Sequence, residues 1–260
     1  MIKNWLKFLI LSHLFLVLSA FIFSMGILKG HDEALDFSLA LACAVFGIYN
    51  INRLNKLETN QLPKELHCWY EQKSFILRFT TKFSLFISAV IYMYLLGLDP
   101  ISLPLFSATG VITILYIYSV RKVNLRQIPG TKALWISTVW TLIGVVIPKV
   151  TANCFVWGDL HYFILFYALT IPGDMRDSEL DNSEMKTIPQ VIGIRNANLL
   201  FYLLISLFLV FYGLLNNLSL VSVFSVLLII NLISKKTITH YRYDLMDGIL
   251  LLLGVCSFLD

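Results

Sequence analysis

Three aspartates stand at helical spacing in the second half of the chain. Asp174, Asp177 and Asp181 occupy positions i, i+3 and i+7, so on a helix their carboxylates would share one face. Carboxylates this close repel one another unless a cation neutralises them, and oxygen ligands of this kind suit Mg²⁺. The spacing also fits a solvated charged loop between two apolar segments. The sequence therefore predicts either a Mg²⁺ site, most plausibly one that holds a phosphate-bearing substrate, or an ordinary polar connection.

The elements that must position these aspartates are strongly apolar. Of the 260 residues, 58% are hydrophobic and only 14% are charged, and the mean hydropathy is +0.77. Long apolar runs recur from end to end, which indicates a polytopic membrane protein. A membrane-buried backbone must satisfy its own hydrogen bonds, so the spans should be helices. Four scattered cysteines without a CxxC pair argue against zinc or a disulfide framework, and no basic-aromatic motif points to nucleic acid.

Apolar runs predict about nine transmembrane helices, with approximate bounds 5–28, 34–52, 74–97, 101–118, 133–148, 158–173, 198–214, 218–234 and 246–259. We therefore expect an all-α integral membrane bundle that forms one domain over 1–260. Lys and Arg gather in the N-terminal tail and in the even-numbered loops. The positive-inside rule then places the N-terminus and those loops in the cytoplasm, and nine spans place the C-terminus outside. In a bacterium this would be the inner or plasma membrane.

The two longest predicted cytoplasmic loops, after the second and sixth spans, resemble each other. When residues 51–60 are set beside 174–183, Arg53 matches Arg176 and Glu58 matches Asp181. This weak repeat suggests pseudo-repeat halves of about 1–130 and 131–260, with a site between them that is roofed by two cytoplasmic motif loops. The fourth loop, on the same side, adds four cations that are candidate diphosphate contacts: Arg121, Lys122, Arg126 and Lys132.

These residues carry a family resemblance. The aspartate run, with the tail Lys186-Thr187-x-Pro189-x-x-x-Gly193, resembles the second aspartate-rich motif of the UbiA superfamily of intramembrane prenyltransferases. Tyr118-Ser119 with Arg121 and Lys122 is similar to that family's tyrosine-and-lysine motif after the fourth span. Tyr49-Asn50 stands where its first motif, Asn-Asp-x-x-Asp-x-x-x-Asp, begins. The resemblance covers nearly the whole chain and implies nine helices with both motifs on cytoplasmic loops.

The first motif departs from the family pattern. Ile51 and Leu54 stand where the family has aspartates, and they are also the residues that face Asp174 and Asp177 in the internal comparison. Asn50 and Glu58 remain as weaker or fewer ligands. Three outcomes follow: one metal instead of two, a different diphosphate pose, or a chain that no longer catalyses. We favour retained catalysis, because an unused second motif would be free to drift.

The resemblance implies an enzyme that transfers a prenyl group from a Mg²⁺-bound prenyl diphosphate to a lipophilic acceptor in the membrane, with an aromatic acceptor preferred. The expected metal ligands are Asp174, Asp177, Asp181, Glu58 and Asn50. The expected diphosphate contacts are Arg53, Arg121, Lys122 and Lys186. The three aspartates and Lys122 are the expected catalytic residues.

Two other functions remain open on the same scaffold: a membrane terpene cyclase, in which the carbocation is quenched within its own chain, and a non-catalytic binding or assembly protein. A transporter fits less well, since no apolar segment shows a Gly/Pro break at mid-membrane. Tyr162, Tyr167 and Tyr202 are candidates for a cation–π wall around a carbocation.

Overall fold

The computed structural model describes residues 8–62, 64–97, 99–117, 128, 130–177, 187–215 and 248–259. Within these ranges the regular elements are all helical. In chain order they are α2 (Leu14–Ile27), α3 (Ala34–Glu58), α4 (Lys64–Leu96), α5 (Ser102–Ile117), α6 (Lys132–Thr141), the π-helix η2 (Leu142–Val146), α7 (Ile147–Thr151), the 3₁₀ turn η3 (Trp157–Leu160), α8 (His161–Asp177), α9 (Ile188–Ile192), α10 (Ile194–Leu215) and α12 (Gly248–Leu259).

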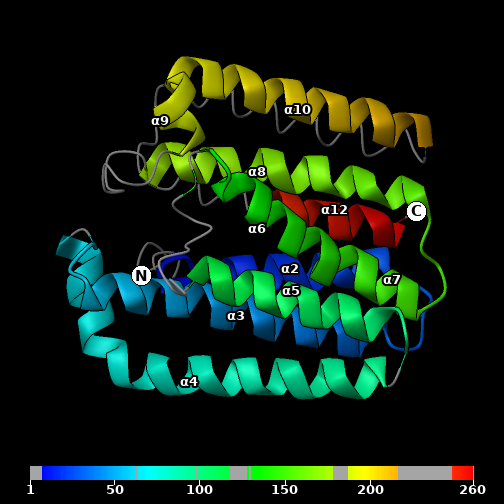
Figure 1. The fold of residues 1–260 in the computed structure, drawn as a ribbon, viewed down its shortest axis with the longest axis horizontal. Helices are drawn as coiled ribbons and strands as arrows, with labels where there is room; N and C mark the ends of the chain where they lie inside the picture. Colours follow the sequence, from blue (N-terminus) through cyan, green and yellow to red (C-terminus); the bar gives the residue numbers. More distant parts are fainter. Residues whose placement is uncertain are drawn as a thin grey trace.

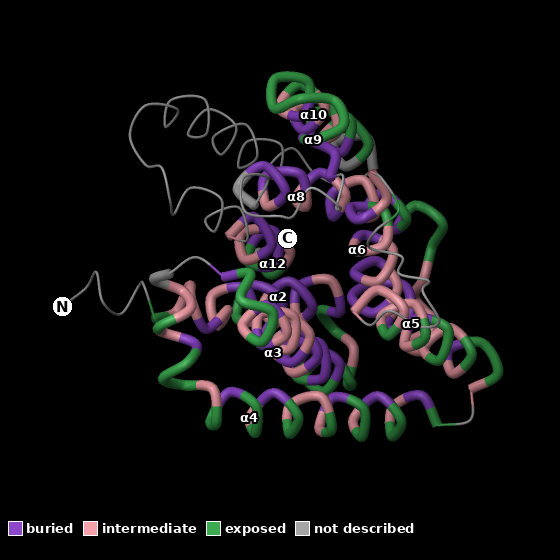
Figure 2. The backbone as a smooth tube through the Cα atoms, turned by 60° about the vertical axis from the view of Figure 1, so that its left-hand side comes forward, coloured by how far each residue is buried: buried purple, intermediate pink, exposed green. Residues whose placement is uncertain are grey.

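Eight of the nine predicted spans coincide with helices, and the other, 218–234, lies outside the described residues. Four helices are long and apolar enough to cross a membrane, namely Ala34–Glu58, Leu66–Leu96, Lys132–Thr151 and Ile194–Phe211. The outward halves of α4 and α10 are exposed (Figure 2). On α4 the exposed side chains include Phe75, Phe79, Phe83 and Phe86. Such a face is what lipid would cover.

The long loop expected after the second span is mostly helix. α3 continues to Glu58 and α4 already begins at Lys64, so Arg53 and Glu58 lie on a helix and not on a loop. α8 likewise extends beyond its apolar part to Asp177. The first motif therefore lies on a helix, and the expectation that it lies on a long loop was wrong. Hydropathy marks where a helix leaves the apolar layer, whereas the helix itself continues as long as its backbone hydrogen bonds do.

The helices run side by side along one axis (Figure 1). α3 packs on α4, where Ser84 and Ser88 each donate a hydrogen bond to a backbone carbonyl of α3, at Cys43 and Ala40, both at 2.8 Å. α2 packs on α12, and α8 packs on α6 and α10. We call the end of the bundle at which α3 ends and α6 begins the motif end.

The first and last described helices cross closely because both carry a glycine there. A Cβ added to Gly26 would lie 2.5 Å from the backbone oxygen of Gly254, so the α2 and α12 backbones meet with no side chain between them. Small residues allow this approach between membrane helices. The crossing holds α2 and α12 in direct backbone contact.

A π-helical segment interrupts α6 and α7 and helps to shape the interior. In π geometry the Ile143 carbonyl would accept a hydrogen bond from residue 148, but Pro148 has no N–H. The Tyr92 hydroxyl donates to that carbonyl instead, at 3.1 Å. Tyr92 is fully buried on α4, so this bond ties the kinked helix to the α3–α4 layer.

Candidate functional site

The first aspartate of the run is buried at the motif end. Asp174, in the last described turn of α8, has 3% of its side chain exposed, and its Oδ1 lies 2.6 Å from the Nζ of Lys132, the first residue of α6. The Lys132 side chain is 11% exposed. Burying a carboxylate without a partner is costly, and Lys132 supplies the partner from a helix far away in the sequence.

The other residues predicted around this aspartate are only partly described. Asp177 is the final residue of α8, one turn beyond Asp174, so both positions share one helix face. Asp181, Lys186, Arg121 and Lys122 lie outside the described residues. Their roles as metal ligands or diphosphate contacts stay predictions.

Asn50, a predicted metal ligand, lies inside the bundle. Its side chain is fully buried, and its Nδ2 donates to the carbonyl of Ser12 at 3.3 Å and to that of Phe46 at 2.9 Å. The Tyr70 hydroxyl, which donates to the Leu11 carbonyl at 2.7 Å, lies 3.5 Å from Asn50 Oδ1. These contacts join α3 to α4 and to the segment before α2.

The remaining residues of the first motif either pack against neighbouring side chains or lie at the surface. Leu54 is 5% exposed and belongs to a small apolar cluster with Leu62, Tyr70 and Leu77. Glu58 is exposed, and its Oε1 lies 3.1 Å from the Arg78 guanidinium on α4. In the structure the predicted ligand Glu58 therefore pairs with a neighbouring helix. Arg53 lies on α3, half-buried.

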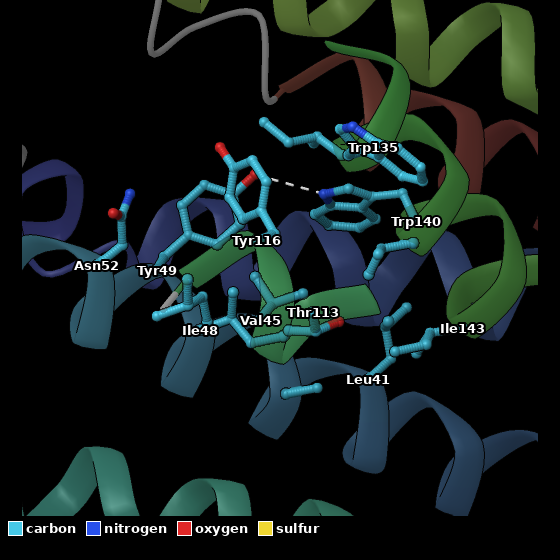
Figure 3. A pocket seen from close by; sticks show the side chains of 14 residues that line it. Leu41, Val45, Ile48, Tyr49, Asn52, Thr113, Tyr116, Trp135, Trp140 and Ile143 are labelled. Atoms are coloured by element: carbon cyan, nitrogen blue, oxygen red, sulfur yellow. Dashed lines mark hydrogen bonds between the residues drawn. The ribbon is translucent and has the colours of Figure 1, made fainter. Parts of the chain in front are cut away.

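An apolar pocket begins beside the motif end and runs between α3, α5 and α6. It encloses about 720 Å³, its open mouth included. α3 contributes Leu41, Ala44, Val45, Ile48, Tyr49 and Asn52, and four aromatic rings are among the lining side chains: Tyr49, Tyr116, Trp135 and Trp140. Asn52 and Tyr49 lie at one end, and Leu41 and Ile143 at the other (Figure 3). A slot of this kind fits a hydrocarbon chain and a flat ring.

Few polar atoms enter this pocket, and two belong to tryptophans. Trp140 Nε1 donates to the Tyr49 hydroxyl at 3.4 Å (Figure 3). Trp135 Nε1 is buried and has no acceptor among the described residues. A buried donor without an acceptor is costly, so Trp135 offers a hydrogen bond to a polar atom of a ligand.

The pocket brings together residues that the sequence did not single out. We expected Tyr162, Tyr167 and Tyr202 as the cation–π wall, whereas the tyrosines that line this pocket are Tyr49 and Tyr116. A helical repeat on α6, in which Lys132 is followed by Trp135, Ile136, Val139, Trp140 and Ile143, was the available signal. It places Lys132 one turn before the pocket-lining stripe.

The donor set at the end of α8 partly fits Mg²⁺. A buried carboxylate with a second aspartate one turn away supplies the oxygen ligands that this ion prefers. No group of three His, Cys, Asp or Glu residues that could hold a metal occurs in the part of the chain that the structure describes. The fit therefore rests on α8, with diphosphate oxygens and water to complete the coordination.

Solved structures share this fold. A structure described as a UbiA homolog from Archaeoglobus fulgidus bound to GPP and Mg²⁺ superposes with a TM-score of 0.65 and 13% identity, covering 98% of this chain and 100% of that one. A second, described as a UbiA homolog from the same organism bound to DMAPP and Mg²⁺, gives a TM-score of 0.64 and 12% identity, covering 97% and 99%.

The likeness lies in the structure and not in the sequence. No protein-family model matches the chain, and no curated protein matches it in sequence. The resemblance to the UbiA superfamily is thus confirmed at the level of the fold.

Proposed function

We propose that this chain is a UbiA-type prenyltransferase, which moves a prenyl group from a Mg²⁺-bound prenyl diphosphate to a lipophilic, aromatic acceptor in the membrane. One observation carries the proposal: the α6 wall of an apolar, aromatic-lined pocket begins at Trp135, one turn after Lys132, which is ion-paired to the buried Asp174. A charged end next to an apolar slot matches an anionic head on a hydrocarbon tail. The solved UbiA homologs with this fold were bound to GPP or DMAPP and Mg²⁺.

In the proposed site, Asp174, Asp177 and Asp181 hold the metal, and Lys122, Arg121, Arg53 and Lys186 contact the diphosphate. Asn50 and Glu58 have other partners in the structure, so a metal contact from either requires those partners to be exchanged. Bound Mg²⁺ supplies positive charge against the diphosphate as it departs.

The chain's own residues then govern the carbon chemistry. The bond between the prenyl C1 and the diphosphate oxygen breaks, and its electron pair leaves with the diphosphate. An acceptor carbon supplies the electrons of the new C–C bond and releases a proton. The apolar wall of the pocket excludes water from the allylic cation. The rings of Tyr49, Tyr116, Trp135 and Trp140 line that wall and can face the cation.

The first test is Asp177→Ala, assayed in membranes with prenyl diphosphate, a range of acceptors and Mg²⁺. We expect roughly a hundredfold loss of transfer, since changing even a residue that only orients a metal ligand costs about 10- to 100-fold. Asp36→Ala, which removes an exposed carboxylate at the opposite end of α3, is the control and should keep its activity. Full activity of Asp177→Ala would contradict the metal assignment.

A second test fills the pocket. Ala44→Phe adds a ring to the α3 wall, so the longest prenyl diphosphate that binds should become shorter along the series geranyl, farnesyl and geranylgeranyl. Leu39→Phe adds the same ring at an exposed position of α3 and should leave chain-length preference unchanged. If both variants accept the same chains as the parent, the pocket does not hold the prenyl tail.

The aromatic wall also suits a membrane terpene cyclase, because four rings around a slot can guide a carbocation as well as shield it. Prenyl diphosphate supplied without any acceptor separates the two activities. A cyclic hydrocarbon product would favour the cyclase, whereas the proposed transferase should form none.

A further inference from the structure

Two lysine–aspartate pairs lie near opposite ends of the helix that runs through α6, η2 and α7. One joins it to α8, and the other joins it to η3, the 3₁₀ turn directly before α8. At the motif end, Lys132 Nζ lies 2.6 Å from Asp174 Oδ1, and at the opposite end Lys149 Nζ lies 2.6 Å from Asp159 Oδ1. Both pairs are largely buried. They provide a matched comparison between the two ends of one helix.

The opposite-end pair agrees with the helix dipoles. Lys149 lies in the last turn of α7, and Asp159 lies in the first turn of η3, where its Oδ2 also accepts a hydrogen bond from the Val156 N–H at 2.9 Å. Cations are favoured at helix C-termini and anions at N-termini. Fold stability is a sufficient reason for this pair.

In the motif-end pair the lysine is placed against the helix dipole. Lys132 is the first residue of α6, directly after the cap residue Thr131, and Asp174 lies in the last described turn of α8. A lysine at a helix N-terminus is at the unfavourable end of the helix dipole. Burying both residues of the pair adds a desolvation penalty. Residues that break local rules in this way are expected at functional sites.

The position of Lys132 indicates which group of a ligand its ammonium can contact. It stands one turn before Trp135 and Ile136 on the α6 face that lines the pocket, and its ammonium adds to the positive end of α6. Lys132 does not itself line the pocket, so an anionic head would extend about one helical turn, roughly 5 Å, beyond the α6 wall to reach this ammonium. The ammonium has three donors, so it can bind a carboxylate and a phosphate oxygen together.

We propose that Lys132 is a fixed cation of the diphosphate site. It neutralises Asp174 in the free protein and bridges Asp174 to a diphosphate oxygen in the bound state, so the site takes one Mg²⁺ per diphosphate. The apolar residues Ile51 and Leu54 on α3 agree with this, since a site with fewer carboxylates holds fewer metal ions. The inference rests on the proposed function.

The test uses the full chain in detergent, with Mn²⁺ in place of Mg²⁺ and geranyl S-thiolodiphosphate as a slowly reacting probe. Bound Mn²⁺ is counted by electron paramagnetic resonance, and we expect one ion per chain with probe present. Lys132→Gln should weaken probe binding about ten- to a hundredfold, as loss of a hydrogen bond between charged groups does. Lys132→Arg keeps the charge and should retain most of the affinity.

Lys149→Gln is the matched control, because it breaks the equivalent pair away from the pocket, and its probe affinity should match the parent's. All variants are compared at a temperature at which each keeps its helical circular dichroism. A count of two Mn²⁺ per unaltered chain would overturn this inference and leave the proposed function standing. Parental probe affinity in Lys132→Gln would do the same. Failure of the unaltered chain to bind probe with Mn²⁺ would overturn the proposed function and the inference together.

Discussion

At the motif end, α3 and α8 carry corresponding residues of the two sequence halves, and the two helices use them differently. On α8 the first of these residues is Asp174, which is buried and forms an ion pair with Lys132. On α3 its counterpart is Ile51, and the next, Leu54, packs in an apolar cluster. The nearby Asn50 amide binds backbone carbonyls at Ser12 and Phe46.

The difference shows what a buried carboxylate requires. Asp174 has a buried ammonium within hydrogen-bonding distance, whereas the acidic residue that α3 keeps, Glu58, pairs with Arg78 at the exposed surface. A buried carboxylate without a partner is costly, and the inward positions Asn50 and Leu54 of α3 carry an amide and an apolar side chain, although Lys56 is buried on this helix too. The α3 end therefore holds helices together, and the α8 end holds charge that a ligand can use.

The largest effect should come from restoring a carboxylate on α3. Leu54→Asp places a charge in the cluster with Tyr70, and we expect it to lower the free energy of unfolding by about 3–5 kcal/mol, the range for an uncompensated buried charge. Ile51→Asp, at a half-buried position, should cost clearly less. Thermal unfolding in detergent measures both. Parental stability in Leu54→Asp, with an additional bound Mn²⁺, would mean that the α3 end is still a metal site.

An intermediate effect is expected at Asn50. Asn50→Leu removes the two amide bonds to buried carbonyls and should cost about 1–3 kcal/mol of stability. Where the variant is folded, Mg²⁺-dependent binding of the diphosphate probe should be unchanged. Tyr70→Phe, which removes the neighbouring bond to the Leu11 carbonyl, is the control for a purely structural loss. Selective loss of probe binding in Asn50→Leu would favour the metal-ligand role that the sequence predicts.

The smallest effect should come from Glu58. Its pair with Arg78 is about half exposed on both sides, and such pairs contribute about 0–1 kcal/mol. Glu58→Gln should therefore shift the melting temperature only slightly, and less at high salt than at low salt. Arg78→Gln should behave alike if the pair acts only at the surface. A drop in Mg²⁺-dependent probe binding for Glu58→Gln, with none for Arg78→Gln, would restore Glu58 as a metal ligand.

The sequence predicted the helices better than their ends. The span expected at 101–118 agrees with α5, described over Ser102–Ile117, to within one residue at each end. The span expected at 34–52 belongs to a helix that continues to Glu58, since its last turns are polar and still helical. The placement of Arg53 and Glu58 on a loop was wrong for this reason.

The candidate site was predicted in part. Asp174 and Asp177 were found from their spacing, which is a local property of one helix. The structure shows Asp174 next to Lys132, which the sequence offered as one of four candidate diphosphate contacts in a loop. The pocket residues Tyr116, Trp135 and Trp140 were missed, and Tyr49 was named only for its place at the start of the first motif, because aromatic residues at helical spacing look the same whether they face lipid, core or a cavity.

By itself, the sequence determined that the chain is an apolar helical bundle and that acidic residues share one face of a helix. Composition and spacing are properties of a single segment and need no contact with the rest of the chain. Only the tertiary structure decided that Lys132 pairs with Asp174, that Asn50 joins α3 to its neighbours, and that α3, α5 and α6 leave a pocket between them. These contacts depend on the register between helices. That register is set by how side chains interlock across them, such as the serines of α4 against the α3 backbone.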